Sequence, residues 1–174
     1  MFKTTANKIT MLRIVLIPVF LLLAYAGRMG AALAVFLIAC VSDFADGYIA
    51  RNYNQISDFG KFMDPLADKM LVLSAMCFFI EKGQMSGWIV AVVLFREFAV
   101  SGLRLLAVEQ GRVIAAAWSG KIKTGCTMVG LALMLLFGQS KALCTFVSIV
   151  ILVTTVYSGV EYFIKNKDVF KDAD

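Results

Sequence analysis

Long apolar runs alternate with short polar segments along the whole chain. Some of these runs are shorter than the roughly 20 residues that a bilayer-spanning helix needs, but weakly polar flanks extend each of them to about 17–25 residues. The six runs are Ile14–Ala26, Ala31–Val41, Met70–Ile80, Trp88–Phe95, Met128–Phe137 and Ala142–Tyr157. The pattern therefore predicts an all-α integral membrane protein with six transmembrane helices.

The predicted helices and their short loops use the whole chain, so we expect a single membrane domain over residues 1–174. Residues 1–10 mix polar and apolar positions, which predicts a short interfacial helix before the first span. No small-residue cleavage site follows the first apolar run, so we expect that run to be retained as a span rather than removed as a signal peptide. The later spans are expected at about residues 31–51, from residue 60, and at about 88–108, 116–136 and 143–163.

Two polar turns and a charged tail complete this layout. Gly27 and Gly30 predict a turn after the first span, and residues 81–84 predict a second turn on the same side of the membrane. Residues 165–174 are rich in charge and predict a solvated tail.

Composition agrees with a membrane protein. Hydrophobic residues make up 60% of the chain and charged residues 17%, whereas soluble domains have about 45–50% and about 25%. The chain has no histidine, and its four cysteines lie in apolar segments without a CxxC spacing. A zinc site is therefore not expected, because zinc is usually bound by cysteine and histidine.

The basic residues predict the orientation of the helices. If six helices alternate in direction, only Arg28, Lys82 and Lys141 fall on one side. The other side carries Lys3, Lys8, Arg13, Arg51, Lys61, Lys69, Arg96, Arg104, Arg112, Lys121, Lys123, Lys165, Lys167 and Lys171. The positive-inside rule then places both termini in the cytoplasm. The net charge of +5 indicates a face turned toward anionic membrane lipids and not nucleic-acid binding.

The acidic residues cluster where the second and third helices meet the cytoplasm. Asp43, Asp46, Gly47 and Ala50 follow the spacing i, i+3, i+4 and i+7, which is one face of a helix. Beyond a polar loop, Gly60, Asp64 and Asp68 are four residues apart and share a face in the same way. A short loop makes the two helices antiparallel neighbours, so the four carboxylates can converge.

Four converging carboxylates at a membrane surface need neutralisation, because like charges repel and buried charge is costly. Oxygen ligands suit hard cations such as Mg²⁺ or Mn²⁺. Two such ions about 3.5–4 Å apart are used for displacement at phosphorus. The alternative is a set of interfacial salt bridges with Arg51, Lys61 and Lys69. The crowding of four acids at one cytoplasmic end favours the metal site.

The same segment carries a longer motif. The string D-x2-D-G-x2-A-R-x8-G-x3-D-x3-D is matched at each of its eight fixed positions, by Asp43, Asp46, Gly47, Ala50, Arg51, Gly60, Asp64 and Asp68. With this motif the chain resembles the CDP-alcohol phosphatidyltransferase family. In length and layout it further resembles the branch that makes phosphatidylglycerophosphate in bacteria. The branch features are the segments 7–18, 63–69, 96–104 and 118–124.

The resemblance implies a fold, a reaction and roles for individual residues. It implies six transmembrane helices around a cytoplasm-facing polar cavity, in a homodimer. The implied reaction joins CDP-diacylglycerol and glycerol 3-phosphate to give phosphatidylglycerophosphate and CMP. Asp43, Asp46, Asp64 and Asp68 would hold two Mg²⁺ or Mn²⁺ ions, and Asp68 would also act as the base for the alcohol. The nucleotide-binding residues would be Asp46, Gly47, Ala50, Arg51 and Gly60.

The chemistry of these residue types agrees with those roles. Glycine lacks a side chain, so the nucleotide can approach the backbone at Gly47 and Gly60. The guanidinium of Arg51 can make two hydrogen bonds to a phosphate.

A phosphorylated acceptor needs an anion site of its own. Glu97, Ser101 and Arg104 lie at i, i+4 and i+7 on one polar face of the fourth helix. Arg112, Lys121 and Lys123 follow, and with Arg104 they are our candidates for binding the acceptor phosphate. The alternative for all four is ordinary positive-inside charge, and Arg96 with Glu97 can be a purely structural pair.

Other functions remain open from sequence alone. Serine, inositol phosphate or phosphatidylglycerol can serve as the acceptor in place of glycerol 3-phosphate. A second alternative is a membrane prenyltransferase, which also binds a diphosphate through aspartates and magnesium. The aspartate motifs of those enzymes lack the Gly, Ala-Arg and second Gly found here. An ion transporter would spread its acidic residues through the depth of the bilayer.

Overall fold

The computed structural model describes residues 5–52, 58–112, 114, 115 and 117–171, with only the backbone described for residues 5–9, 43–52, 58–62, 64, 65, 170 and 171. The described part is helical, with no strand assigned in it. Its elements are α1 (Thr5–Tyr25), α2 (Met29–Asn52), α3 (Asp58–Glu81), α4 (Gly87–Glu109), α5 (Trp118–Phe137), α6 (Lys141–Lys165) and α7 (Asp168–Lys171). The six long helices confirm the helix count expected from the apolar runs, and apart from the start of α1 their ends agree with the predicted ranges to within about two residues.

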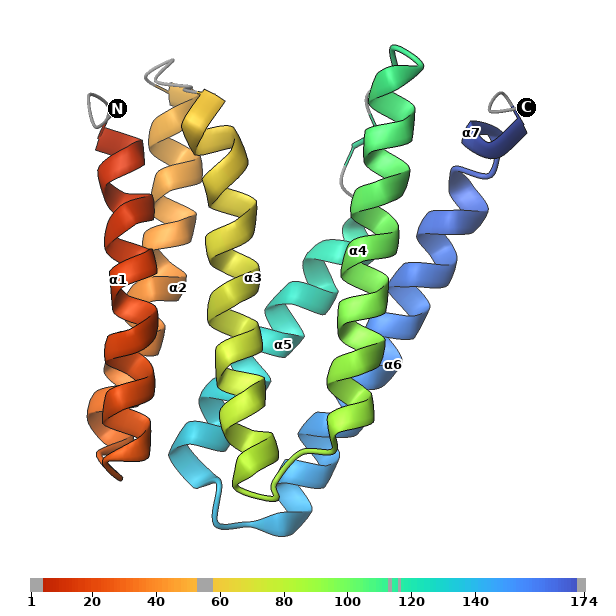
Figure 1. The fold of residues 1–174 in the computed structure, drawn as a ribbon. Coiled ribbons are helices and arrows are strands. Elements are labelled where there is room, and N and C mark those ends of the chain that lie inside the picture. The colour runs from red at the N-terminus through yellow and green to blue at the C-terminus, as the bar shows by residue number, and fades with distance from the viewer. Residues whose placement is uncertain (1–4, 53–57, 113, 116, 172–174) are drawn as a thin grey trace.

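The long helices alternate in direction (Figure 1). Helices α1, α2 and α3 form one group and α4 and α6 form another, while α5 crosses obliquely between them (Figure 1). The groups come together at the lower end of the view and diverge toward the upper end. The start of α1, the end of α2, the start of α3 and the end of α6 all lie at this upper end (Figure 1). The alternation therefore brings the acidic motif and the basic segments to one end of the bundle.

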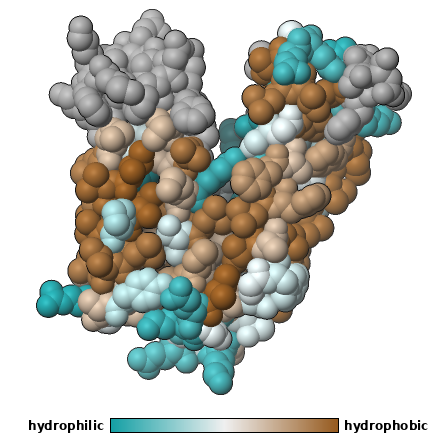
Figure 2. All heavy atoms as spheres, viewed as in Figure 1, coloured by the Kyte–Doolittle hydropathy of each residue, from teal (hydrophilic) through white to brown (hydrophobic). Residues whose placement is uncertain are grey.

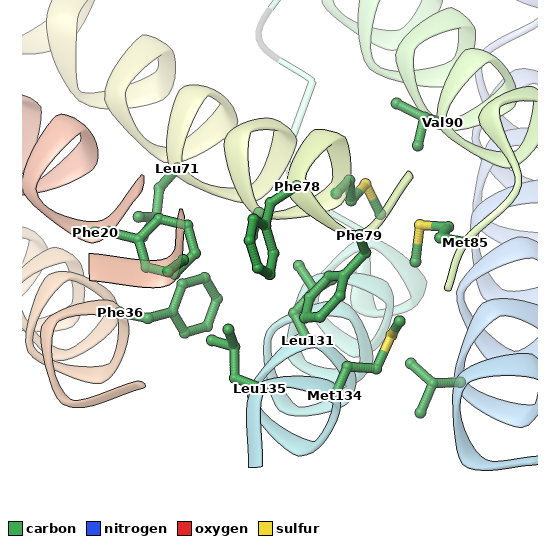
Figure 3. Close-up of a cluster of buried hydrophobic side chains, with 14 of the residues drawn as sticks. Phe20, Phe36, Leu71, Phe78, Phe79, Met85, Val90, Leu131, Met134 and Leu135 are labelled. Carbon is green, nitrogen blue, oxygen red and sulfur yellow. The ribbon is translucent and has the colours of Figure 1, made fainter. Parts of the chain in front are cut away.

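The main core takes buried residues from all six long helices. The rings of Phe20 and Phe36 are 5.7 Å apart between centroids, at a tilted angle. Leu71 and Phe79 of α3 and Leu131 of α5 are almost fully buried beside them (Figure 3). Between helices in a membrane such contacts stabilise through van der Waals packing and not through removal of apolar surface from water. This packing holds the six long helices together below the divergent end.

Glycines act at two kinds of position in this packing. Gly27 and Gly83 adopt φ values of +74° and +67° in the turns after α1 and α3, a conformation that L-residues with a side chain rarely adopt. Gly130 instead permits close approach of α5 and α6, because a Cβ there would lie 2.7 Å from Cγ1 of Val147. The turns predicted at Gly27 and at residues 81–84 are thus confirmed, but Gly30, which was assigned to the first turn, lies in the first turn of α2.

Hydrophobic residues cover most of the middle of the visible surface, and hydrophilic residues gather toward its ends (Figure 2). Of the described helices, α5 and α6 are long and apolar enough to cross a membrane, while α1 and α2 contain shorter apolar segments, Thr10–Tyr25 and Met29–Ser42. Helix α4 contains four charged residues, Arg96, Glu97, Arg104 and Glu109, and the side chains at the ends of α2 and α3 that carry the acidic motif are in part outside the described set. Six membrane spans therefore stay a prediction.

Two expectations about the ends of the chain differ from the structure. Residues 5–25 form one continuous helix, so the described part contains no separate interfacial helix before the first span. The tail was expected to be solvated, but residues 168–171 form α7, and Val169 is buried against Val100, Leu103 and Tyr162. A lone valine in a charged segment gives no periodic signal, whereas in the fold it fills a gap between α4 and α6.

Candidate active site

The acidic motif lies on helical backbone at the upper end of the bundle. Asp43, Asp46, Gly47, Ala50 and Arg51 are in α2, and Gly60, Asp64 and Asp68 are in α3. The helical spacing on which the shared faces depend is therefore confirmed for both segments. Of these eight residues only Asp68 has a described side chain. The convergence of the four carboxylates lies outside the described residues and stays a prediction.

Asp68 is held by an arginine from the first helix. Nη1 of Arg13 donates a hydrogen bond of 2.8 Å to Oδ1 of Asp68. Arg13 is completely buried, while the side chain of Asp68 is 32% exposed. A buried guanidinium requires an anionic partner, because removing its charge from water costs several kcal/mol. The pair therefore fixes the direction of the Asp68 carboxylate and ties α1 to α3.

Two neighbouring cavities lie between α3, α4, α5 and α6, and Asp68 lines the first of them. The first has a volume of about 200 Å³ and is lined by Asp68, Lys69, Glu97, Lys123 and Thr124 together with apolar side chains of α3, α4 and α5. The second has a volume of about 280 Å³ and a more polar wall, which comprises Lys69, Arg96, Glu97, Ser101, Arg104, Gly120, Lys121, Thr124 and Tyr162 with two apolar residues. Lys69, Glu97 and Thr124 belong to both walls, so the cavities are neighbours.

Glu97 is the centre of the charged network between the cavities. Its Oε1 accepts hydrogen bonds of 2.8 Å from Nζ of Lys123 and 2.9 Å from Nη1 of Arg96. Nζ of Lys69 lies 3.8 Å from Oε2 of Glu97 and donates a 2.8 Å hydrogen bond to Oγ of Ser101. Helices α3, α4 and α5 are thereby joined through one carboxylate.

Small residues make room for Arg96 between α4, α5 and α6. Its Nη2 donates a 2.6 Å hydrogen bond to Oγ of Ser158. A Cβ at Gly159 would lie 3.2 Å from Cγ of Arg96, and one at Gly120 would lie 3.6 Å from Nη2. The glycines therefore let this large side chain lie between the helices and reach both Glu97 and Ser158.

Two further cations of the second cavity are placed by aromatic residues. Nε of Arg104 donates a 2.9 Å hydrogen bond to the hydroxyl of Tyr162, and the guanidinium lies 5.5 Å from the centre of that ring. Nζ of Lys121 lies 4.9 Å from the centre of the Trp118 ring. Such cation–π contacts contribute about 0.5–1 kcal/mol at exposed sites. They orient the cations without neutralising them.

The sequence-predicted acceptor residues are therefore distributed over three cavities. Arg104 and Lys121 line the second cavity and Lys123 the first. Arg112 lines a third cavity of about 540 Å³ with Trp118, Lys165, Asn166 and others, which shares Tyr162 and Ala117 with the second. The polar face predicted for the fourth helix is found as expected, since Glu97, Ser101 and Arg104 all line the second cavity.

Among the side chains that the structure describes, no three carboxylates or thiols lie close enough to form a metal site. Three of the four predicted ligands, Asp43, Asp46 and Asp64, fall outside that set. The donor chemistry nevertheless fits a divalent cation, because the motif supplies carboxylate oxygens from two adjacent helices. Asp68 lines the first cavity from the last position of this motif.

Comparison with known proteins identifies the family. The model of CDP-alcohol phosphatidyltransferases matches residues 3–160. The chain belongs to the CDP-alcohol phosphatidyltransferase family. This is a family of membrane-embedded proteins that use divalent metals.

Three curated relatives illustrate the similarity. The chain is 39% identical to the CDP-diacylglycerol--glycerol-3-phosphate 3-phosphatidyltransferase of Bacillus subtilis (strain 168), with 97% of each chain covered. It is 39% identical to the probable phosphatidylglycerophosphate synthase of Mycobacterium tuberculosis (strain ATCC 25618 / H37Rv), over 90% of this chain and 78% of that protein. It is 40% identical to the CDP-diacylglycerol--glycerol-3-phosphate 3-phosphatidyltransferase of Escherichia coli (strain K12), over 73% of this chain and 74% of that protein.

Several residues of this CDP-alcohol phosphatidyltransferase site gave little signal in the sequence. Arg13 precedes an apolar run and looks like ordinary positive-inside charge, yet it is buried against Asp68. Tyr162 lies near the end of the last predicted span and outside every motif, yet it is 2% exposed and accepts a hydrogen bond from Arg104. Arg96 and Glu97 do form a pair, as considered from the sequence, but Glu97 also contacts Lys123.

Proposed function

We propose that this chain transfers the phosphatidyl group of CDP-diacylglycerol to glycerol 3-phosphate, which gives phosphatidylglycerophosphate and CMP. The observation that carries the proposal is 39% identity, over 97% of both chains, to a relative named for this reaction. The complete acidic motif and the cation-lined cavities beside Asp68 support it.

In the proposed reaction an acceptor hydroxyl attacks the phosphorus that carries the diacylglycerol. A new P–O bond forms there, the bond from that phosphorus to the bridging oxygen of the diphosphate breaks, and CMP leaves with the electron pair. Asp68 takes the hydroxyl proton, in a position where its carboxylate lines the first cavity. Two divalent cations held by Asp43, Asp46, Asp64 and Asp68 would stabilise negative charge on the diphosphate.

The remaining residues of the motif serve the nucleotide. Gly47 and Gly60 leave the backbone open to close approach, beside Asp46 and Ala50, and Arg51 hydrogen-bonds to phosphate or ribose oxygens. The acceptor phosphate is bound by Arg104, Lys121 and Lys123, with Arg112 at the edge of the site. The arrangement of Arg104 and Lys121 around one cavity supports this role. The competing acceptors are serine, inositol phosphate and phosphatidylglycerol, and an assay of purified protein with each of them tests the choice.

The proposal includes six membrane spans in one domain, with both termini and the active site in the cytoplasm. The alternation of helices in Figure 1 supports this orientation, since it brings the basic segments to one end. Surrounding membrane lipids and a second copy of the chain, in a homodimer, are the other proposed partners.

Topology is tested by cysteine labelling in a variant without its four native cysteines. Asn54→Cys, in the segment between α2 and α3, is expected to react with an impermeant maleimide only in inverted vesicles or permeabilised cells. Lys82→Cys, in the turn after α3, is expected to react in intact cells. The opposite result at both positions would reverse the orientation and remove the active site from the cytoplasm.

Arg13 is expected to act as a positioning residue for Asp68. Arg13→Ala should lower kcat by about tenfold, since Asp68 loses the hydrogen bond that directs it, and should change KM for glycerol 3-phosphate much less. Arg13→Lys keeps the charge and should restore part of kcat. A change in KM with kcat unaltered would contradict this assignment.

A further inference from the structure

The cations that line the second cavity outnumber its described carboxylates, whereas the first cavity has two lysines, Lys69 and Lys123, and two carboxylates, Asp68 and Glu97. The second cavity is lined by Lys69, Arg96, Arg104 and Lys121 and, among the described residues, by the single carboxylate of Glu97. Lys123 lines the first cavity and is hydrogen-bonded to the same carboxylate. Arg104 and Lys121 contact aromatic side chains instead. Glu97 therefore carries much of the balancing charge for a strongly cationic site.

Glu97 holds its two lysine partners with different strength: the contact with Lys123 is short and the contact with Lys69 is long. Lys123 has a side chain only 7% exposed and donates to Glu97 at 2.8 Å. Nζ of Lys69 lies 3.8 Å from the carboxylate, which is too long for a hydrogen bond. Lys69 belongs to the walls of both cavities. An anion that enters either cavity therefore meets lysines that are already attracted to Glu97.

We infer that Glu97 is an internal counter-ion that competes with the acceptor phosphate for Lys69 and Lys123, and thereby limits how tightly the site holds phosphate. The inference rests on the proposed acceptor site. In the absence of the acceptor, Glu97 keeps the buried lysine paired. When a phosphate binds, its oxygens replace part of the carboxylate's contacts.

This competition has a consequence for turnover. The product retains the phosphate that the acceptor brought into the site, so a site with unopposed cations would bind the product as tightly as the acceptor. A carboxylate that returns to Lys69 and Lys123 favours product release. Glu97 therefore weakens binding of the acceptor and speeds departure of the product.

The test uses Glu97→Gln, which keeps the size and a hydrogen-bond acceptor but removes the charge. Inorganic phosphate is titrated calorimetrically into the purified full-length protein in detergent with Mg²⁺. We expect the variant to bind phosphate about tenfold more tightly, because one unit of charge several ångströms away is worth at least that factor at a dielectric constant of about 20. We also expect KM for glycerol 3-phosphate and kcat to fall together. Unchanged or weaker phosphate binding would overturn the inference.

Matched variants separate charge from structure. Glu97→Asp keeps the charge and should bind phosphate like the wild type. Glu109→Gln makes the same change on α4 at an exposed position that lines none of the cavities described above, and it should alter neither phosphate binding nor turnover. If Glu109→Gln tightens phosphate binding as much as Glu97→Gln does, the effect comes from the net charge of the protein and not from the position of Glu97, and the inference is overturned.

Two further measurements complete the test. If Arg104→Ala fails to weaken phosphate binding, the proposed acceptor site is wrong and this inference fails with it. If Arg104→Ala weakens phosphate binding but Glu97→Gln does not tighten it, only the counter-ion inference fails.

If Glu97→Gln does not fold, infrared difference spectra of the wild type labelled with ¹³C-glutamate still test the inference, because the chain has only four glutamates. Phosphate should shift a labelled carboxylate band that is missing in Glu97→Asp. The absence of a shift would overturn the inference.

Discussion

Replacement of Asp43, Asp46 or Asp64 by asparagine is expected to abolish turnover while the protein stays in the membrane. A neutral amide is a poor substitute for a carboxylate that bridges or neutralises divalent cations. Metal ions stabilise the charge of a phosphoryl transition state by several kcal/mol, which corresponds to a loss of about a thousandfold or more in rate. The measurement is release of CMP by purified variants at saturating CDP-diacylglycerol and glycerol 3-phosphate.

The matched control for these variants is Asp58→Asn. Asp58 begins α3 and stands at a variable position of the acidic motif, not at one of its eight fixed positions, so the same loss of charge there should leave turnover within about twofold of wild type. Chelator should also silence the wild-type enzyme, and added Mg²⁺ or Mn²⁺ should restore it. Full activity in excess chelator would refute the two-metal proposal, even if the aspartate variants were inactive.

Arg104→Ala is expected to raise KM for glycerol 3-phosphate by about ten- to a hundredfold, with little change in KM for CDP-diacylglycerol. Each hydrogen bond to a charged group contributes roughly 1.5–3 kcal/mol, and 1.36 kcal/mol corresponds to about tenfold in affinity. Lys123→Ala should act in the same direction. Because Lys123 is paired with Glu97, its removal also alters the counter-ion, so Arg104 gives the clearer result.

Two variants serve as references for this prediction. Tyr162→Phe removes the hydroxyl that accepts from Arg104 but leaves the guanidinium, so it should raise KM for glycerol 3-phosphate less than Arg104→Ala does. Arg51→Ala should instead damage use of CDP-diacylglycerol. If the Arg104 and Lys123 variants lose affinity for CDP-diacylglycerol, those cations serve the donor. If neither KM changes, they are ordinary positive-inside charge, and an unphosphorylated acceptor becomes the better proposal.

Local sequence pattern is enough to predict the helices and the members of the acidic motif. Six apolar runs separated by short polar segments correspond to α1–α6, because helix length and hydrophobic pattern are local properties. The turns at Gly27 and Gly83 can also be predicted from sequence, because glycine adopts positive φ without steric cost and therefore marks tight turns. The helical spacing of Asp43, Asp46, Asp64 and Asp68 follows from the 3.6-residue period alone.

Which helix faces meet, and hence which charged side chains are partners, depends on the packing of the whole bundle. Arg13 pairs with Asp68 across 55 positions of sequence, and Arg104 reaches Tyr162 across 58. Glu97 looked like half of a local pair with Arg96, yet it also balances Lys123 from α5. Periodicity gives the faces of a single helix, but rotation and crossing of helices arise from packing of side chains far apart in the chain. The pairing of charged side chains in the site therefore cannot be predicted from the sequence and requires the folded structure.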